Sequence, residues 1–121
     1  MSTDTFEALF GWIMKIAIAQ INPIIGDFEY NFDRIKDFSE KAVALSCDLV
    51  VFPELVVSGY PPRDLLERND FIEANLACLN RLVDSIRGIG IICGFVEKNP
   101  PGKGKPLYNA AVLFEDGKIV H

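Results

Sequence analysis

One carboxylate follows an apolar run in the first half of the chain. Residues 48–52, Asp-Leu-Val-Val-Phe, are rich in β-branched side chains and are followed at once by Pro53 and Glu54. Such a run predicts a strand buried on both faces, as in a parallel sheet flanked by helices. Ligands of open α/β sheets bind at the carboxyl ends of strands, so Glu54 is predicted to lie where chemistry occurs. It could act there as a general base, or it could be a helix cap or a surface ion-pair partner.

The other reactive side chains are few. Cys47, Cys78 and Cys93 show no CxxC spacing, and the only histidine is His121 at the end of the chain. The sequence therefore predicts no metal site. Three cysteines in apolar surroundings predict reduced, buried thiols and a cytoplasmic protein rather than a disulfide framework.

An irregular segment, residues 55–66, follows the glutamate. Pro61 and Pro62 cannot continue a central strand, which predicts a loop over the edge of the sheet. The loop is well placed to line a pocket, and Tyr60 in it is interpreted, on the residues alone, as an aromatic that packs against the prolines.

Hydrophobic periodicity predicts the elements that position these residues. Amphipathic helices are expected from Asn31, the predicted N-cap, to residue 45 and over residues 70–86. Gly94 suggests close packing or a bulge within its strand. Asn109 is interpreted as a turn-side amide, with a pocket role as the alternative. Asp116 and Gly117 predict a hairpin turn. Strands are expected over residues 15–20, 48–52, 89–96, 107–114 and 118–121, which gives an α/β domain with a mainly parallel sheet and an antiparallel hairpin at its C-terminal edge.

The length of 121 residues allows one modest domain. The net charge of −5, without a basic stripe, argues against a nucleic-acid partner. Residues 1–13 are too short an apolar segment to span a membrane, and we interpret them as an N-terminal extension upstream of a natural start at Met14, with a docking helix as the alternative. The chain ends within its last expected strand, which predicts a domain incomplete at the C-terminus.

Three segments resemble the nitrilase-like carbon–nitrogen hydrolase superfamily. KIAIAQINP at residues 15–23, with Gly26, Asp27 and Asn31, and FPEL at residues 52–55 resemble the superfamily in general. SGYPPRDLL at residues 58–66 is similar to the glutaminase domain of glutamine-dependent NAD synthetases. In addition to these three, LYNAAV at residues 107–112 resembles a later strand of the family. Residues 14–121 are therefore interpreted as the N-terminal portion of such a domain.

The resemblance implies an α-β-β-α sandwich, of which this chain supplies about half. It also implies amide hydrolysis by a Glu-Lys-Cys triad, in which Glu54 is the general base for a cysteine nucleophile. The lysine and the cysteine of the family pattern fall beyond His121, so the chain alone is expected to be inactive. Tyr60 falls where this branch has a substrate-pocket tyrosine.

The implied activity is the release of ammonia from glutamine for ATP-dependent amidation of deamido-NAD. No cofactor is expected in this portion, since ATP, Mg²⁺ and deamido-NAD would belong to a synthetase domain that this chain lacks. An aliphatic amidase, a carbamoyl-amine hydrolase and a catalytically inactive α/β module remain alternatives. The sheet face left for the second half of the sandwich would be exposed and apolar, which predicts self-association.

Overall fold

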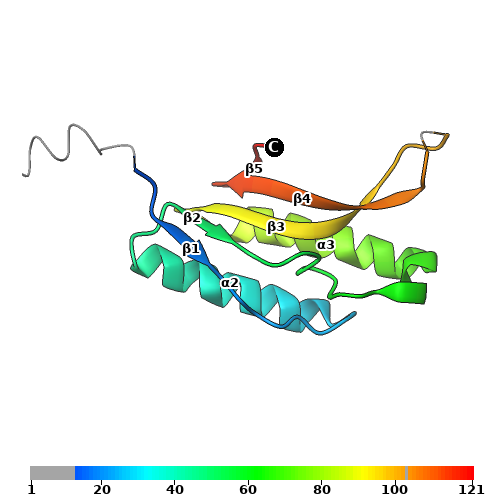
Figure 1. The fold of residues 1–121 in the computed structure, drawn as a ribbon, viewed down its shortest axis with the longest axis horizontal. Helices are drawn as coiled ribbons and strands as arrows, with labels where there is room; N and C mark the ends of the chain where they lie inside the picture. The colour runs from blue at the N-terminus through cyan, green and yellow to red at the C-terminus, as the bar shows by residue number, and fades with distance from the viewer. Residues whose placement is uncertain (1–12, 103) are drawn as a thin grey trace, which may run out of the picture.

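The computed structural model describes residues 13–102 and 104–121, so the predicted extension at residues 1–13 lies outside it except for Ile13. The described residues confirm the α/β class, because strands and helices alternate as expected from the sequence (Figure 1). The elements in chain order are β1 (Ile16–Ile18), α2 (Phe28–Ala44), β2 (Leu49–Val51), the 3-10 helix η1 (Arg63–Glu67), α3 (Asn69–Ser85), β3 (Gly90–Lys98), β4 (Leu107–Glu115) and β5 (Lys118–Ile119).

The strands form one sheet of five in the order β1-β2-β3-β4-β5. β1, β2 and β3 are parallel to one another, and β4 and β5 add the predicted antiparallel edge. Asp116 and Gly117, at φ +49° and +83°, form the turn between β4 and β5. A two-residue hairpin turn needs positive φ at its central residues, and Asp and Gly tolerate it.

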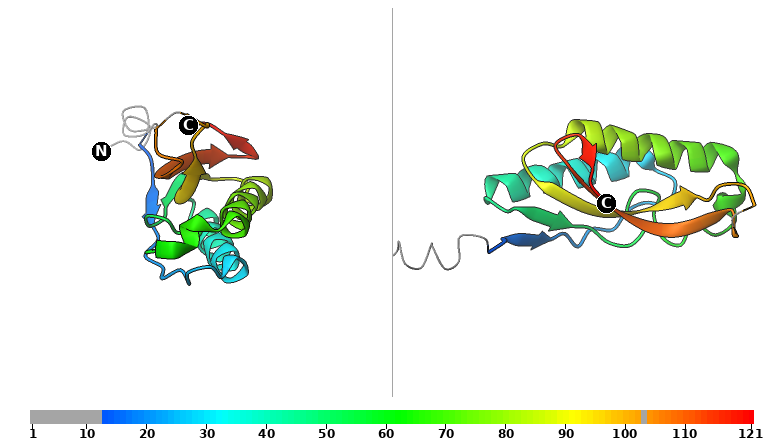
Figure 2. Two further views of the ribbon diagram at one scale, coloured as in Figure 1. Left: turned by 90° about the vertical axis from the view of Figure 1, so that its right-hand side faces the viewer. Right: turned by 90° about the horizontal axis from the view of Figure 1, so that it is seen from above.

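Both α-helices cover the same face of the sheet (Figure 2). Each connects one parallel strand to the next in the same direction across the sheet, and right-handed crossovers then place both helices on one side. Val50, Ile91 and Phe114 point toward the helices and are almost completely buried. The prediction that β2 is buried on both faces is therefore wrong for the described chain, since Leu49 and Val51 on the opposite face are half-buried.

The uncovered face carries a continuous apolar row. Ile18, Val51, Ile92 and Leu113 lie opposite one another in the register of β1, β2, β3 and β4. Ile18, at the end of this row, is 75% exposed. One sheet with helices on a single face corresponds to the expected half of an α-β-β-α sandwich. In the part of the chain that the structure describes, no helix has the length and apolar character needed to cross a membrane.

Helix α2 begins one turn earlier than predicted. Asp27, rather than Asn31, is its N-cap, and the Asp27 carboxylate accepts a hydrogen bond from the backbone N–H of Tyr30. Asn31 is instead completely buried, and its side-chain amide donates to the carbonyl oxygens of Ile24 (2.9 Å) and Val57 (3.0 Å). Both Asp and Asn can cap a helix. Which of the two residues caps α2 depends on the tertiary hydrogen bonds that keep Asn31 buried. The Asn31 amide links the segment before α2 to the loop after Glu54.

Candidate active site

Glu54 follows the carboxyl end of β2, as predicted. Beyond Val51 the backbone stays beside β3, because the N–H of Phe52 donates to the carbonyl of Ile92 at 2.9 Å. A tight turn then begins at Glu54, with Leu55 at φ +48° and the N–H of Gly59 bonded to the carbonyl of Leu55 at 2.8 Å. The turn therefore holds Glu54 just beyond the carboxyl end of β2.

Gly94 in β3 allows the turn to rest directly on the sheet. A Cβ atom at Gly94 would lie 2.4 Å from the backbone nitrogen of Leu55 and 3.2 Å from the Cα of Glu54. The carbonyl of Gly94 also accepts a hydrogen bond of 3.3 Å from the N–H of Val57. The close packing suggested for Gly94 from the sequence is therefore present, and it fixes the backbone that carries Glu54.

The Glu54 carboxylate contacts the side chain of Asn109. The amide nitrogen Nδ2 of Asn109 donates a hydrogen bond to Oε1 of Glu54. Asn109 lies within β4 opposite Val96, so its interpretation as a turn-side amide is wrong. The Glu54 side chain is exposed in this chain. A cleft of about 340 Å³ adjoins it, lined by Phe52, Pro53, Glu54, Ile92, Cys93, Gly94, Asn109, Ala110 and Ala111.

Tyr60 lies beside a second cleft, of about 280 Å³. Its side chain is 61% exposed, so it does not serve as a buried packing aromatic in this chain. Asn109 lines both clefts, which brings the two residues singled out by the sequence, Glu54 and Tyr60, to neighbouring cavities on one edge of the sheet. The second cleft is lined by Leu55, Tyr60, Pro62, Leu66, Val96, Leu107, Tyr108 and Asn109.

Tyr108 borders the second cleft from β4. It faces Glu97 across the β3–β4 pair, and its hydrogen bond with that carboxylate raises the pKa of the Tyr108 phenol above its ordinary value. The phenol therefore remains protonated at neutral pH. It contributes a neutral polar group to this wall of the cleft.

The cysteines are unsuited to act as the nucleophile here. All three are free and buried. Burial raises the pKa of the Cys93 thiol, which lies next to the Glu54 cleft, to about 12, and raises that of Cys78 to about 11. Since the thiolate is the reactive form, neither thiol attacks a carbonyl at neutral pH. The interpretation of these two residues as small core side chains agrees with their burial.

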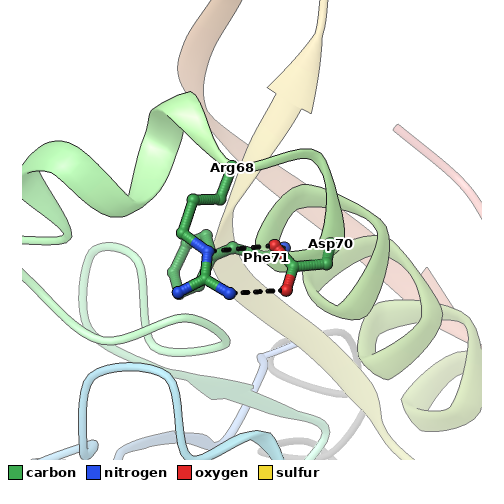
Figure 3. A network of polar contacts seen from close by, with 3 residues as sticks. All are labelled: Arg68, Asp70 and Phe71. Carbon is green, nitrogen blue, oxygen red and sulfur yellow. Dashed lines mark hydrogen bonds and ion pairs between the residues drawn. The ribbon is translucent and has the colours of Figure 1, made fainter.

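Another cleft, of about 410 Å³, lies away from Glu54, next to the start of α3. Arg68 and Asp70 form a two-pronged ion pair at its rim, with Nη2 to Oδ2 at 2.8 Å and Nε to Oδ1 at 3.2 Å (Figure 3). The hydrogen bond from Arg68 lowers the pKa of the Asp70 carboxyl. Asp70 also accepts the backbone N–H of Phe71 at 3.0 Å. These charges satisfy each other, so the cleft offers no unpaired reactive group comparable to Glu54.

Across residues 13–102 and 104–121, no group of three His, Cys, Asp or Glu side chains is arranged to hold a metal ion. The side chains of Glu54, Asn109, Tyr60 and Tyr108 bring a carboxylate, a carboxamide and two phenols to the two clefts at the carboxyl edge. A carboxylate of this kind can accept a proton from a substrate or from a nucleophile.

The fold and the site together define an α/β domain whose candidate active site is a carboxylate at the carboxyl edge of its parallel strands. Residues 15–121 match the family model of carbon-nitrogen hydrolases. The chain belongs to this family.

Proteins similar to this chain include glutamine-dependent NAD synthetases and an amidase. A glutamine-dependent NAD(+) synthetase of Xanthomonas campestris is 37% identical over 114 residues, which cover 93% of this chain and 20% of that protein. The solved structure of the glutamine-dependent NAD+ synthetase of Acinetobacter baumannii aligns with a TM-score of 0.80 and 30% identity, over 89% of this chain and 20% of that one. An amidase of Nesterenkonia shares the fold at a TM-score of 0.72 and 24% identity, covering 89% of this chain and 41% of the amidase. The chain thus spans about a fifth of the length of the curated relatives.

Proposed function

We propose that this chain is part of a glutaminase domain that releases ammonia from glutamine for the amidation of deamido-NAD. The observation that carries the proposal is the position of Glu54, exposed at the carboxyl edge of the sheet and hydrogen-bonded to Asn109 between two clefts. The similarity to glutamine-dependent NAD synthetases supports the choice of glutamine as the substrate.

In this proposal Glu54 is the general base. It takes the proton of a cysteine thiol, and the resulting thiolate attacks the carboxamide carbon of glutamine. The C–N bond then breaks, the nitrogen leaves as ammonia with the proton returned from Glu54, and water hydrolyses the thioester to glutamate. Tyr60 would bind the substrate from the neighbouring cleft through its hydroxyl.

The remaining machinery is assigned to other parts of the protein. We propose that residues outside these 121 supply the nucleophilic cysteine and the oxyanion-stabilising lysine, so we expect the 121-residue chain alone to be inactive. ATP, Mg²⁺ and deamido-NAD would bind only to a synthetase portion. The cytoplasm is the proposed location, in keeping with three free thiols.

Substrate comparison tests the proposal in the full-length protein that carries this chain. Ammonia release should be at least about 100-fold more efficient, in kcat/KM, with glutamine than with acetamide or an N-carbamoyl amine, because a site that pairs a substrate's polar groups rejects analogues that lack them. Tyr60→Phe should raise the KM for glutamine about 10-fold with little change in kcat, which corresponds to the loss of one hydrogen bond.

Tyr30→Phe is the matched control, since Tyr30 is an exposed tyrosine on α2. It should leave both kinetic constants unchanged. A preference for acetamide or for the carbamoyl amine would replace the glutaminase assignment by another hydrolase of the family. If the full-length protein hydrolyses none of these amides, the chain is part of a non-catalytic α/β module.

The uncovered apolar face leads to a prediction for the isolated chain. We expect it to self-associate at micromolar concentration, because a contiguous apolar patch on a sheet is rarely left in water, and a second copy offers the same apolar row. Size-exclusion chromatography with light scattering should give a mass above 13.5 kDa. Ile18→Lys, which puts a charge at the most exposed position of the row, should shift the mass toward that of the monomer.

Leu45→Lys provides the comparison for this experiment. Leu45 is 64% exposed and lies at the end of α2, on the helical side of the molecule. Its substitution adds the same charge without touching the row, so the associated mass should persist. A monomeric parent chain, or equal effects of the two substitutions, would show that the sheet face does not mediate association.

A further inference from the structure

The contact between Glu54 and Asn109 joins two segments that lie 55 residues apart in the sequence. Among the residues that the structure describes, it is the only hydrogen bond made by the Glu54 carboxylate. An exposed glutamate has several side-chain rotamers available, and a charge-assisted hydrogen bond selects one of them. The orientation of the proposed base therefore depends on Asn109.

Asn109 is itself held by a well-supported part of the sheet. Strand β4 pairs with β3 along its whole length, and Asn109 lies opposite Val96. The buried side chain of Asn75 on α3 brackets Val96, accepting its N–H at 3.2 Å and donating to its carbonyl at 2.7 Å. A chain of contacts thus runs from α3 through β3 and β4 to the Glu54 carboxylate.

We infer that Asn109 is a positioning residue that orients Glu54 for proton transfer, an inference that rests on the proposed function. One carboxylate oxygen, Oε1, accepts the amide N–H, which leaves the other oxygen to receive the proton. A carboxamide suits this task because it donates a hydrogen bond without titrating and so does not compete as a base. Asn109 also lines both clefts, so the residue that orients Glu54 borders the Tyr60 cavity as well.

The kinetic test uses Asn109→Leu in the full-length enzyme. The substitution keeps the size of the side chain and removes the donor. We expect kcat for glutamine hydrolysis to fall about 10- to 100-fold with KM within about 2-fold, because misplacing a reacting group by about 1 Å costs up to about 100-fold. Asn80→Leu, at an exposed asparagine of α3, should leave both constants unchanged.

A second measurement covers the case in which Asn109→Leu folds poorly. In the unsubstituted chain, the side-chain NH₂ resonances of Asn109 in NMR spectra should shift as acid protonates Glu54, and Glu54→Gln should abolish that response. The NH₂ group of Asn75, which donates to a backbone carbonyl, serves as the internal reference. If acid leaves the NH₂ resonances of Asn109 unshifted, or if they shift equally in Glu54→Gln, the inference is wrong.

Different kinetic results would contradict the positioning role of Asn109 and the base role of Glu54. If kcat of Asn109→Leu stays within 2-fold of the parent while Glu54→Gln loses activity, Asn109 does not position the base, and the proposed function is unaffected. If Glu54→Gln retains full activity, the base assignment itself is wrong.

Discussion

Glu54→Gln in the full-length enzyme is expected to lower kcat for glutamine hydrolysis by about 10²- to 10⁴-fold, the contribution of a well-placed general base. Glutamine has the shape of glutamate, and its Oε1 can still accept the hydrogen bond from Asn109. The substitution thus preserves the position of the side chain and removes only its capacity to take a proton. KM should change little, since substrate binding is assigned to the neighbouring cleft.

Steady-state ammonia release across a range of glutamine concentrations separates these two constants. Glu40→Gln is the matched control, because Glu40 is an exposed glutamate on α2, paired with Lys36 at 3.9 Å and remote from the sheet edge. It should retain parental kcat. A Glu54→Gln enzyme with parental kcat would remove Glu54 from the chemistry, and a change confined to KM would make it a binding residue.

Gly94→Ala is expected to lower the free energy of unfolding by about 1–3 kcal/mol, the usual effect of overpacking a closely packed site. The added methyl group would meet the backbone nitrogen of Leu55 at 2.4 Å. That backbone cannot easily move away, because hydrogen bonds anchor the turn at Val57 and Gly59. Because the same turn carries Glu54, the full-length variant should also lose glutaminase activity.

Gly90→Ala separates this steric effect from the general effect of a glycine substitution in β3. Its added Cβ would lie 3.0 Å from Cδ1 of Leu49, the end of a flexible side chain that can rotate away. Urea unfolding followed by circular dichroism, at one fixed protein concentration, should place the midpoint of Gly90→Ala close to that of the parent and that of Gly94→Ala clearly lower. Equal midpoints would show that the turn adjusts to the methyl group.

Several features of the fold could be predicted from local sequence patterns. The helix predicted over residues 70–86 is present as α3, and Ile72, Leu79 and Val83, which recur at helical spacing, are buried in it. The pair Asp116 and Gly117 forms the hairpin turn because its backbone preferences are local. The predicted start of α2 is wrong because Asp27 and Asn31 are both suitable N-caps. Asn31 does not cap the helix because its amide bonds to the carbonyl groups of Ile24 and Val57, 7 and 26 residues away, and no local pattern reveals these contacts.

The sequence by itself determined the alternation of strands and helices and the position of Glu54 after a strand, because hydrophobic spacing and proline act within a few residues. Only the tertiary structure decided that Asn109 meets Glu54 and lies between its cleft and that of Tyr60. The reason is that strand register is a long-range property: pairing β4 with β3 sets which side chains of β4 reach the edge where β2 ends. Tertiary packing likewise decided that both helices lie on one face and that Ile18, Val51, Ile92 and Leu113 form the row on the other, because crossover handedness and strand register are properties of whole connections.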